Sequence, residues 1–146
     1  MQMSLKLIDA IYNTLKNDVE FMALLGLTPT SPPASITAKL VRGAEADSAI
    51  NGTTCPMVLM YVKPGRYGRN YLVFEGKFCL DFYGKNSFQA KQMAELAYKL
   101  FHDQTISDAT FHSYRCYLAY DADFATGISG VKGYESIFDV DYFRGN

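Results

Sequence analysis

The sequence has few of the residues and patterns on which catalysis, disulfide frameworks and membrane spans depend. It contains no tryptophan, two histidines and three cysteines among 146 residues. The cysteines, Cys55, Cys79 and Cys116, are odd in number and form no C-x-x-C pair, which argues against a secreted disulfide framework and favours a reducing compartment. The longest apolar run, at 57–62, is far shorter than the about 20 residues that a membrane-spanning helix needs. The sequence therefore predicts neither a disulfide-stabilised nor a membrane-spanning protein.

A surplus of charge of one sign is also missing. Fourteen lysines and arginines stand against fifteen aspartates and glutamates, for a formal net charge of -1. Such a balance argues against a dedicated nucleic-acid binder, which usually carries a basic surplus. Hydrophobic residues make up 49% of the chain and charged residues 20%, which excludes a disordered protein. Aromatic residues are abundant, with 11 tyrosines and 10 phenylalanines, and such residues are common in strands and interfaces.

Hydrophobic periodicity predicts the elements. Apolar residues at three- and four-residue steps predict a helix over 4–25, and Asn86 followed by Gln89 predicts a capped helix over 86–101. The further expected elements are a short strand at 36–41, strands at 57–62, 71–83, 110–120 and 134–143, and loops at 28–35, 43–54, 63–70 and 121–133. The predicted fold class is α+β. Residues 1–146 are expected to form one domain, with a mostly antiparallel sheet of four to five strands, two helices packed on one face and a long hairpin loop.

A search for catalytic motifs finds none. There is no H-E-x-x-H, no G-x-S-x-G and no Walker A loop. We therefore expect no catalytic residues, no metal and no cofactor. One alternative stays open, in which a small intracellular enzyme or ligand-binding domain uses the carboxylates of Asp121, Asp123, Asp139 and Asp141. Asp139 and Asp141 would share a strand face about 7 Å apart, a spacing that suits a divalent cation or a solvated strand surface.

The clearest polar feature is the basic loop expected between two strands, at 63–70. Lys63, Arg66 and Arg69 bracket Tyr67 and Tyr71, among turn-forming glycine, proline and asparagine. Positive charge interleaved with aromatics is typical of a nucleic-acid contact. Three charges are few, however, and the pattern also fits a solvated turn or docking onto an acidic protein. We take Lys63, Arg66, Tyr67 and Arg69 as the candidate partner-binding residues.

The order of these segments resembles a known family. Four segments follow one another: a helix like SLKLIDAIYNTLKNDVEFMALLG, a strand CPMVLMYV, an alternating strand YLVFEGKFCLDFYGK and the capped helix NSFQAKQMAELAYKLF. This order resembles that of the tail terminator, or tail completion, proteins of long-tailed bacteriophages. Related minor structural proteins of the phage neck share this layout. The resemblance lies in patterns of apolar residues, and the part at 72–101 fits best.

The resemblance implies a structural role. Proteins of that family form rings, with six subunits expected, that cap the tail tube, stop its growth and join the tail to the head. The expected partners are further copies of the chain, a tail tube protein, a head–tail connector protein and, without sequence specificity, DNA in the lumen. The expected location is the virion, at the tail or neck, and the host cytoplasm during assembly, with no membrane contact. The alternatives are the small enzyme above and a nucleic-acid-binding module.

Overall fold

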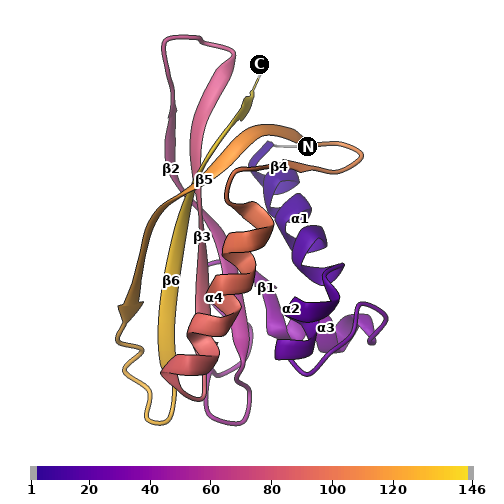
Figure 1. Ribbon diagram of the computed structural model, residues 1–146, viewed down its shortest axis with the longest axis vertical. Coiled ribbons are helices and arrows are strands. Elements are labelled where there is room, and N and C mark those ends of the chain that lie inside the picture. The colour runs from indigo at the N-terminus through magenta and orange to yellow at the C-terminus, as the bar shows by residue number, and fades with distance from the viewer. Residues whose placement is uncertain (1–2, 145–146) are drawn as a thin grey trace.

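The computed structural model describes residues 3–144, which fold as one sheet with helices on one side (Figure 1). The described part contains four helices and six strands. In chain order they are α1 (Met3–Lys16), α2 (Val19–Leu24), α3 (Pro33–Lys39), β1 (Leu40–Arg42), β2 (Met57–Tyr67), β3 (Val73–Gly84), α4 (Ser87–Phe101), β4 (Gln104–Ser107), β5 (His112–Phe124) and β6 (Lys132–Phe143). None of the described helices is long and apolar enough to cross a membrane.

The strands lie in the order β1-β2-β3-β6-β5-β4. β1 pairs with β2 in parallel, and every other pair is antiparallel. The expected sheet, with four to five strands and two helices, was therefore too simple. The additions are short elements, such as α3 and β4, whose few residues leave little periodicity to detect.

The N-terminal helix is two helices, which corrects the expectation of one continuous helix over 4–25. Asp18 is extended and caps α2, its side chain accepting a hydrogen bond from the amide of Phe21 at 2.8 Å. An aspartate at the N-cap accepts a hydrogen bond from a backbone amide that would otherwise be unpaired at the start of a helix. The helix is therefore interrupted at Asp18, although the apolar spacing continues through it. Leu7, Ile11 and Leu15 of α1 are buried against the sheet.

The strand expected at 36–41 is mostly α3. Pro33 begins this helix, in the position that proline favours because its fixed φ suits the first turn and no amide is needed there. Only Leu40–Arg42 is extended, as β1. The loop expected at 43–54 is confirmed. Its Ala46 and Ile50 pack with Val41, Met57 and Leu59 on the sheet face that the helices leave open.

The second predicted helix is confirmed as α4. Asn86 is its cap and accepts a hydrogen bond from the amide of Gln89 at 2.8 Å. The side chain of Gln89 accepts a hydrogen bond from the amide of Lys85, whereas in a capping box it would accept from the amide of the cap residue itself. The alanines on its inner face, Ala90, Ala94 and Ala97, are buried, and they allow the helix to lie close to the sheet.

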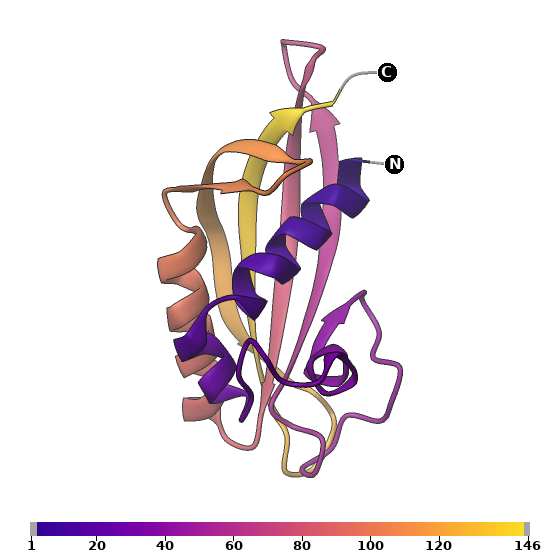
Figure 2. The same ribbon diagram turned by 90° about the vertical axis from the view of Figure 1, so that its right-hand side faces the viewer.

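The predicted alternation in β3 is confirmed at its centre. Phe78, Leu80 and Phe82 point toward the helices and are fully buried. The ring of Phe78 stacks on Phe138 of β6 at 5.0 Å and meets the edge of Phe101 of α4 at 5.5 Å. All four helices contribute to this main core, and in Figure 2 α4 stands beside the strands while α1 crosses in front of them. The loop expected at 121–133 is shorter, because β5 continues to Phe124 and β6 starts at Lys132.

Candidate assembly surface at the hairpin tip

The hairpin of β2 and β3 extends past the other strands at one end of the molecule (Figure 1). We call residues 63–72 the hairpin tip. The loop expected at 63–70 is mostly strand, because β2 continues to Tyr67 and only 68–72 form the turn. The basic side chains therefore stand on a two-stranded arm rather than on a long loop.

A bulge explains why proline and glycine do not end β2. The register between β2 and β3 shifts between Lys63 and Arg66, across Pro64 and Gly65. β1 pairs with β2 only as far as Met60, so Pro64 removes no ladder hydrogen bond on that side. A Cβ on Gly65 would lie 2.4 Å from a ring carbon of Phe74, so the two strands approach closely because this residue is glycine.

The tip is held by its own contacts. The side chain of Asn70 accepts a hydrogen bond from the amide of Leu72 at 3.0 Å, which fixes the turn. The Tyr67 hydroxyl donates to the carbonyl oxygen of Arg144 at 2.8 Å, and its ring meets the edge of Phe74. The guanidinium of Arg144 lies 4.6 Å from the centre of the Phe74 ring. The chain end that follows β6 thus supports the tip.

The four predicted tip residues have different roles. Tyr67 is a support, since its hydroxyl and ring are both engaged. Arg66 lies 3.5 Å from a carboxylate oxygen of Glu75, and the Lys63 ammonium lies over the ring of Tyr61 at 5.3 Å. Arg69 is exposed and forms no ion pair with any residue between 3 and 144. It is the predicted residue with the greatest freedom to bind a partner.

The largest exposed side chain of the tip is Tyr71, which the sequence places beside the basic residues but which is not among the candidate partner-binding residues. Tyr71 is 78% exposed and the neighbouring Leu72 is 41% exposed. Both were assigned to the start of a strand, but they lie in the turn. The signal was available, because an aromatic residue beside Asn70 in a turn has no core to enter. The tip therefore combines positive charge with apolar surface.

The four aspartates of the alternative hypothesis do not form one cluster. Asp139 and Asp141 share the open face of the sheet, as expected, where Asp139 is paired with Lys77 and burial raises the pKa of Asp141. Asp121 and Asp123 lie on the helix side. Asp121 accepts a hydrogen bond from the Tyr134 hydroxyl at 2.7 Å, and Asp123 lies 3.4 Å from the ammonium of Lys91. Asp121 and Asp123 pair with Ser136 and Tyr134, whose side chains face the helices, so these two aspartates lie on the face opposite to Asp139 and Asp141.

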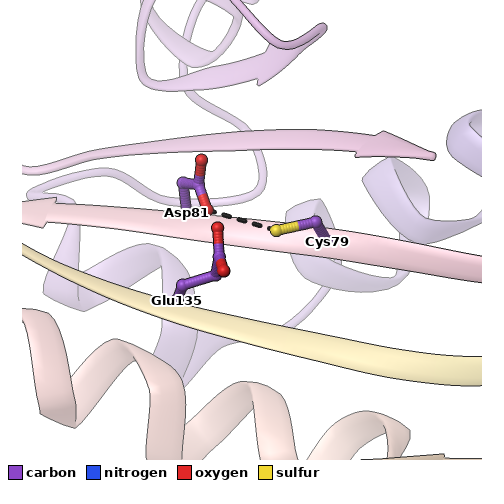
Figure 3. Close-up of side chains that lie close together, drawn as sticks. All are labelled: Cys79, Asp81 and Glu135. Carbon is purple, nitrogen blue, oxygen red and sulfur yellow. Dashed lines mark hydrogen bonds between the residues drawn. The ribbon is translucent and has the colours of Figure 1, made fainter. Parts of the chain in front are cut away.

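A different group of titratable side chains meets in the middle of the open face. Cys79 and Asp81 of β3 and Glu135 of β6 place their ligand atoms within 4.8 Å of one another (Figure 3). Asp81 faces Glu135 in the strand register, which the sequence alone does not reveal. Asp81 accepts hydrogen bonds from the Tyr61 hydroxyl at 2.8 Å and from the Cys79 thiol at 3.2 Å.

This group is better suited to holding a proton than to catalysis. Burial and the neighbouring Glu135 raise the pKa of Asp81 to about 6. Burial also raises the pKa of the Cys79 thiol and of the Tyr61 hydroxyl, so both stay protonated and donate to Asp81. A thiolate is the nucleophilic form of cysteine, and this site disfavours it. Cys79, Asp81 and Glu135 are the described residues whose atoms are grouped closely enough to offer ligands to a metal ion.

Exposed tyrosines line the outer part of the open face. The register shifts in β5 place Tyr117 opposite Asp139 and Tyr120 opposite Ile137, and both of those partners face away from the helices. Without the shifts, residues three apart in a strand would point to opposite faces. Tyr117 is 47% exposed and Tyr120 is 68% exposed. This alignment cannot be read from the order of residues in β5, because bulges change the alternation of side chains between the two faces.

Comparison with known proteins identifies a similar fold but no family. No protein-family model matches the chain, and no curated protein matches it. Among solved structures, a chain from the virion of a native gene transfer agent particle has the same fold, with a TM-score of 0.63. The match covers 94% of this chain and 94% of that chain, at 10% sequence identity. At that identity the likeness shows the fold alone.

Proposed function

We propose that this chain is a structural component of a phage-like virion. In this proposal it forms a ring at the end of the tail tube, stops tube growth and joins the tail to the head connector. The observation that carries the proposal is the fold shared with a virion chain over 94% of both chains. The more specific part of the proposal, a tail terminator, rests in addition on the resemblance in the order of elements, which is strongest at 72–101.

The chemistry of the described residues fits a structural role better than an enzymatic one. The aspartates of the alternative site are divided between two faces of the sheet. Tyr61 and Cys79 donate hydrogen bonds to Asp81, and the pKa values of these three groups are raised, while Glu135 lies beside Asp81 on the next strand. Acid–base catalysis needs a group positioned to exchange its proton with a substrate, and these groups bind one another instead.

The sheet has two different surfaces on which a ring could close. β1 pairs with the edge of β2 only as far as Met60, and β4 pairs with the edge of β5 only as far as Cys116. The outer edges of β2 beyond Met60 and of β5 beyond Cys116 lie on opposite sides of the same sheet. Cyclic assembly needs two different patches on each subunit, and unpaired strand edges readily accept another chain. Six subunits is the number that the family resemblance implies.

The proposed partners beyond the ring are the tail tube protein and the connector protein. The hairpin tip projects from the sheet and is not needed to cover the core, so it is available for an assembly contact. DNA passing through the lumen of a ring would also lie within reach of basic side chains, and such contacts weaken with salt.

The test removes the gene from a phage-like element that encodes this chain and restores it from a plasmid. The proposal predicts tails of uncontrolled length that carry no heads, and normal particles after restoration. Purified wild-type particles should contain about six copies of the chain at one end of the tube. Complete particles of normal length made without the chain would contradict the proposal.

A further inference from the structure

A second apolar surface lies far from the hairpin tip. It is a groove of about 510 Å³ between α2 and α4, and Leu24, Phe88 and Leu96 form much of its floor. Phe88 is 72% exposed, although it stands in the first turn of a helix whose inner face is buried. Figure 1 shows α2 and the start of α4 at the opposite end of the long axis from the tip. A protomer therefore cannot place its own tip in this groove.

The rim of the groove is acidic. Glu20 of α2 and Glu95 of α4 line it, together with Lys91. The ammonium of Lys91 lies 3.4 Å from Asp123 and over the ring of Tyr134, so its charge is already partly balanced. The groove thus offers an apolar floor beside carboxylates.

The tip carries the complementary features. Tyr71 and Leu72 present apolar surface, and Arg69 stands two residues before Tyr71 with no ion-pair partner among residues 3–144. The bond from the Leu72 amide to Asn70 and the bond from Tyr67 to Arg144 hold the turn in shape. A rigid element loses less conformational freedom on binding than a flexible loop does.

We propose that the hairpin tip of one copy docks into the groove between α2 and α4 of a second copy. Tyr71 and Leu72 lie on the apolar floor, and Arg69 faces Glu20 and Glu95. The contact is head to tail, so it closes into a ring if the rotation between neighbours allows it. Its place in a particle rests on the proposed function, but the contact itself belongs to the purified chain.

The experiment measures the self-association of the full chain by sedimentation over a range of concentrations. Arg69→Glu and Glu95→Arg, made singly, should each raise the dissociation constant by about tenfold, because each puts like charges together. Tyr71→Ser should do the same by removing apolar contact. Lys99→Glu is the matched control, since it changes charge on an exposed position of α4 outside the groove, and it should have no effect.

Two combinations make the test specific. The chain that carries both Arg69→Glu and Glu95→Arg should associate as the wild type does. A mixture of the two single variants should also regain association, because the reversed tip of one fits the reversed groove of the other. Only a contact between the tip and the groove of different copies predicts both results.

Failure of this contact is distinct from failure of the proposed function. If the chain forms an oligomer whose dissociation constant is the same for the wild type and all three variants, the docking is wrong. A ring closed by strand edges would then be the remaining explanation. A chain that stays monomeric up to about 1 mM, a limit that corresponds to only about 4 kcal/mol of binding, would also overturn the docking. In either case the composition of purified particles would still decide the virion role.

Discussion

The two ends of the β2–β3 hairpin are built from the same pair of strands but lie in opposite environments. At the base, Met57–Met60 of β2 and residues 78–82 of β3 are buried on both faces. The helices cover one face there, and residues 43–54 cover part of the other. At the tip, both faces are exposed and the contacts are local. The base is thus required for folding, whereas the tip exposes surface that folding does not use.

This difference assigns separate roles to the two ends. Burial of apolar surface stabilises a fold in proportion to the area removed from water, and the tip contributes little of it. An arm that folding does not require, yet that is kept rigid by Asn70, Tyr67 and Arg144, is suited to a partner. Variants at the base should therefore change stability most, and variants of the exposed side chains at the tip should change assembly.

The largest effect is expected at the base, from Phe78→Ala. The ring is fully buried between Phe101 and Phe138, so its removal leaves a cavity and should lower the free energy of unfolding by about 3–5 kcal/mol. Urea denaturation measures the change. Phe88→Ala, at an exposed position, is the control and should cost less than about 1 kcal/mol. A cost below about 1 kcal/mol for Phe78→Ala would show that this face of β3 is not core.

The next effect concerns pH and the Asp81 carboxyl. Its pKa is raised to about 6, so between pH 4 and pH 6 the folded chain keeps a proton that the unfolded chain has lost. This group therefore makes stability fall as pH rises through that window, by on the order of 2–3 kcal/mol. Asp81→Asn should remove this part of the pH dependence. Urea titrations of the wild type and the variant at each pH measure it, as the difference between their free energies of unfolding. A difference that does not change between pH 4 and pH 7 would contradict the raised pKa.

A smaller effect is expected at the boundary between base and tip, from Gly65→Ala. The added methyl would lie 2.4 Å from the Phe74 ring and 2.7 Å from the carbonyl oxygen of Glu75, so the strands must separate. We expect a loss of about 1–3 kcal/mol. Gly52→Ala, where a Cβ meets nothing within 4 Å, is the matched control. If both variants are equally stable, the strands do not approach closely at the bulge.

The smallest change in stability among the tip supports is expected from Tyr67→Phe. It removes the hydrogen bond to Arg144 and keeps the ring on Phe74, so the cost should be about 0.5–1.5 kcal/mol. Amide hydrogen exchange should increase at Arg144, whose amide donates to the carbonyl oxygen of Leu72, and at Leu72, whose amide donates to the side chain of Asn70 in the same turn. Unchanged exchange at both amides would mean that the tip does not depend on this tyrosine.

The sequence predicted the elements whose signals are local. The cap at Asn86 and the alternation through Phe78, Leu80 and Phe82 specify α4 and the centre of β3 without help from distant residues. The break at Asp18 was missed because apolar spacing runs through it. A periodic pattern and a capping residue compete there, and the cap decides.

The site was less predictable because it depends on strand register. Cys79, Asp81 and Glu135 meet only because β3 pairs with β6, and Tyr117 and Tyr120 align only because β5 is bulged. The basic tip was found from its composition, yet Tyr67 proved to be a support and Tyr71 the exposed aromatic. Composition indicates that a surface is unusual, whereas the roles of its residues follow from contacts between distant segments.

Whether the tip serves assembly rather than folding is decided by two measurements on one double variant, Arg66→Ser with Arg69→Ser. Both side chains are exposed, so the free energy of unfolding should stay within about 0.5 kcal/mol of the wild type. Assembly of particles from phage-like elements that carry the variant should fall by tenfold or more, with unjoined heads and tails seen by electron microscopy. A variant that folds normally and still completes particles at wild-type yield would contradict the account and reduce the tip to a solvated turn.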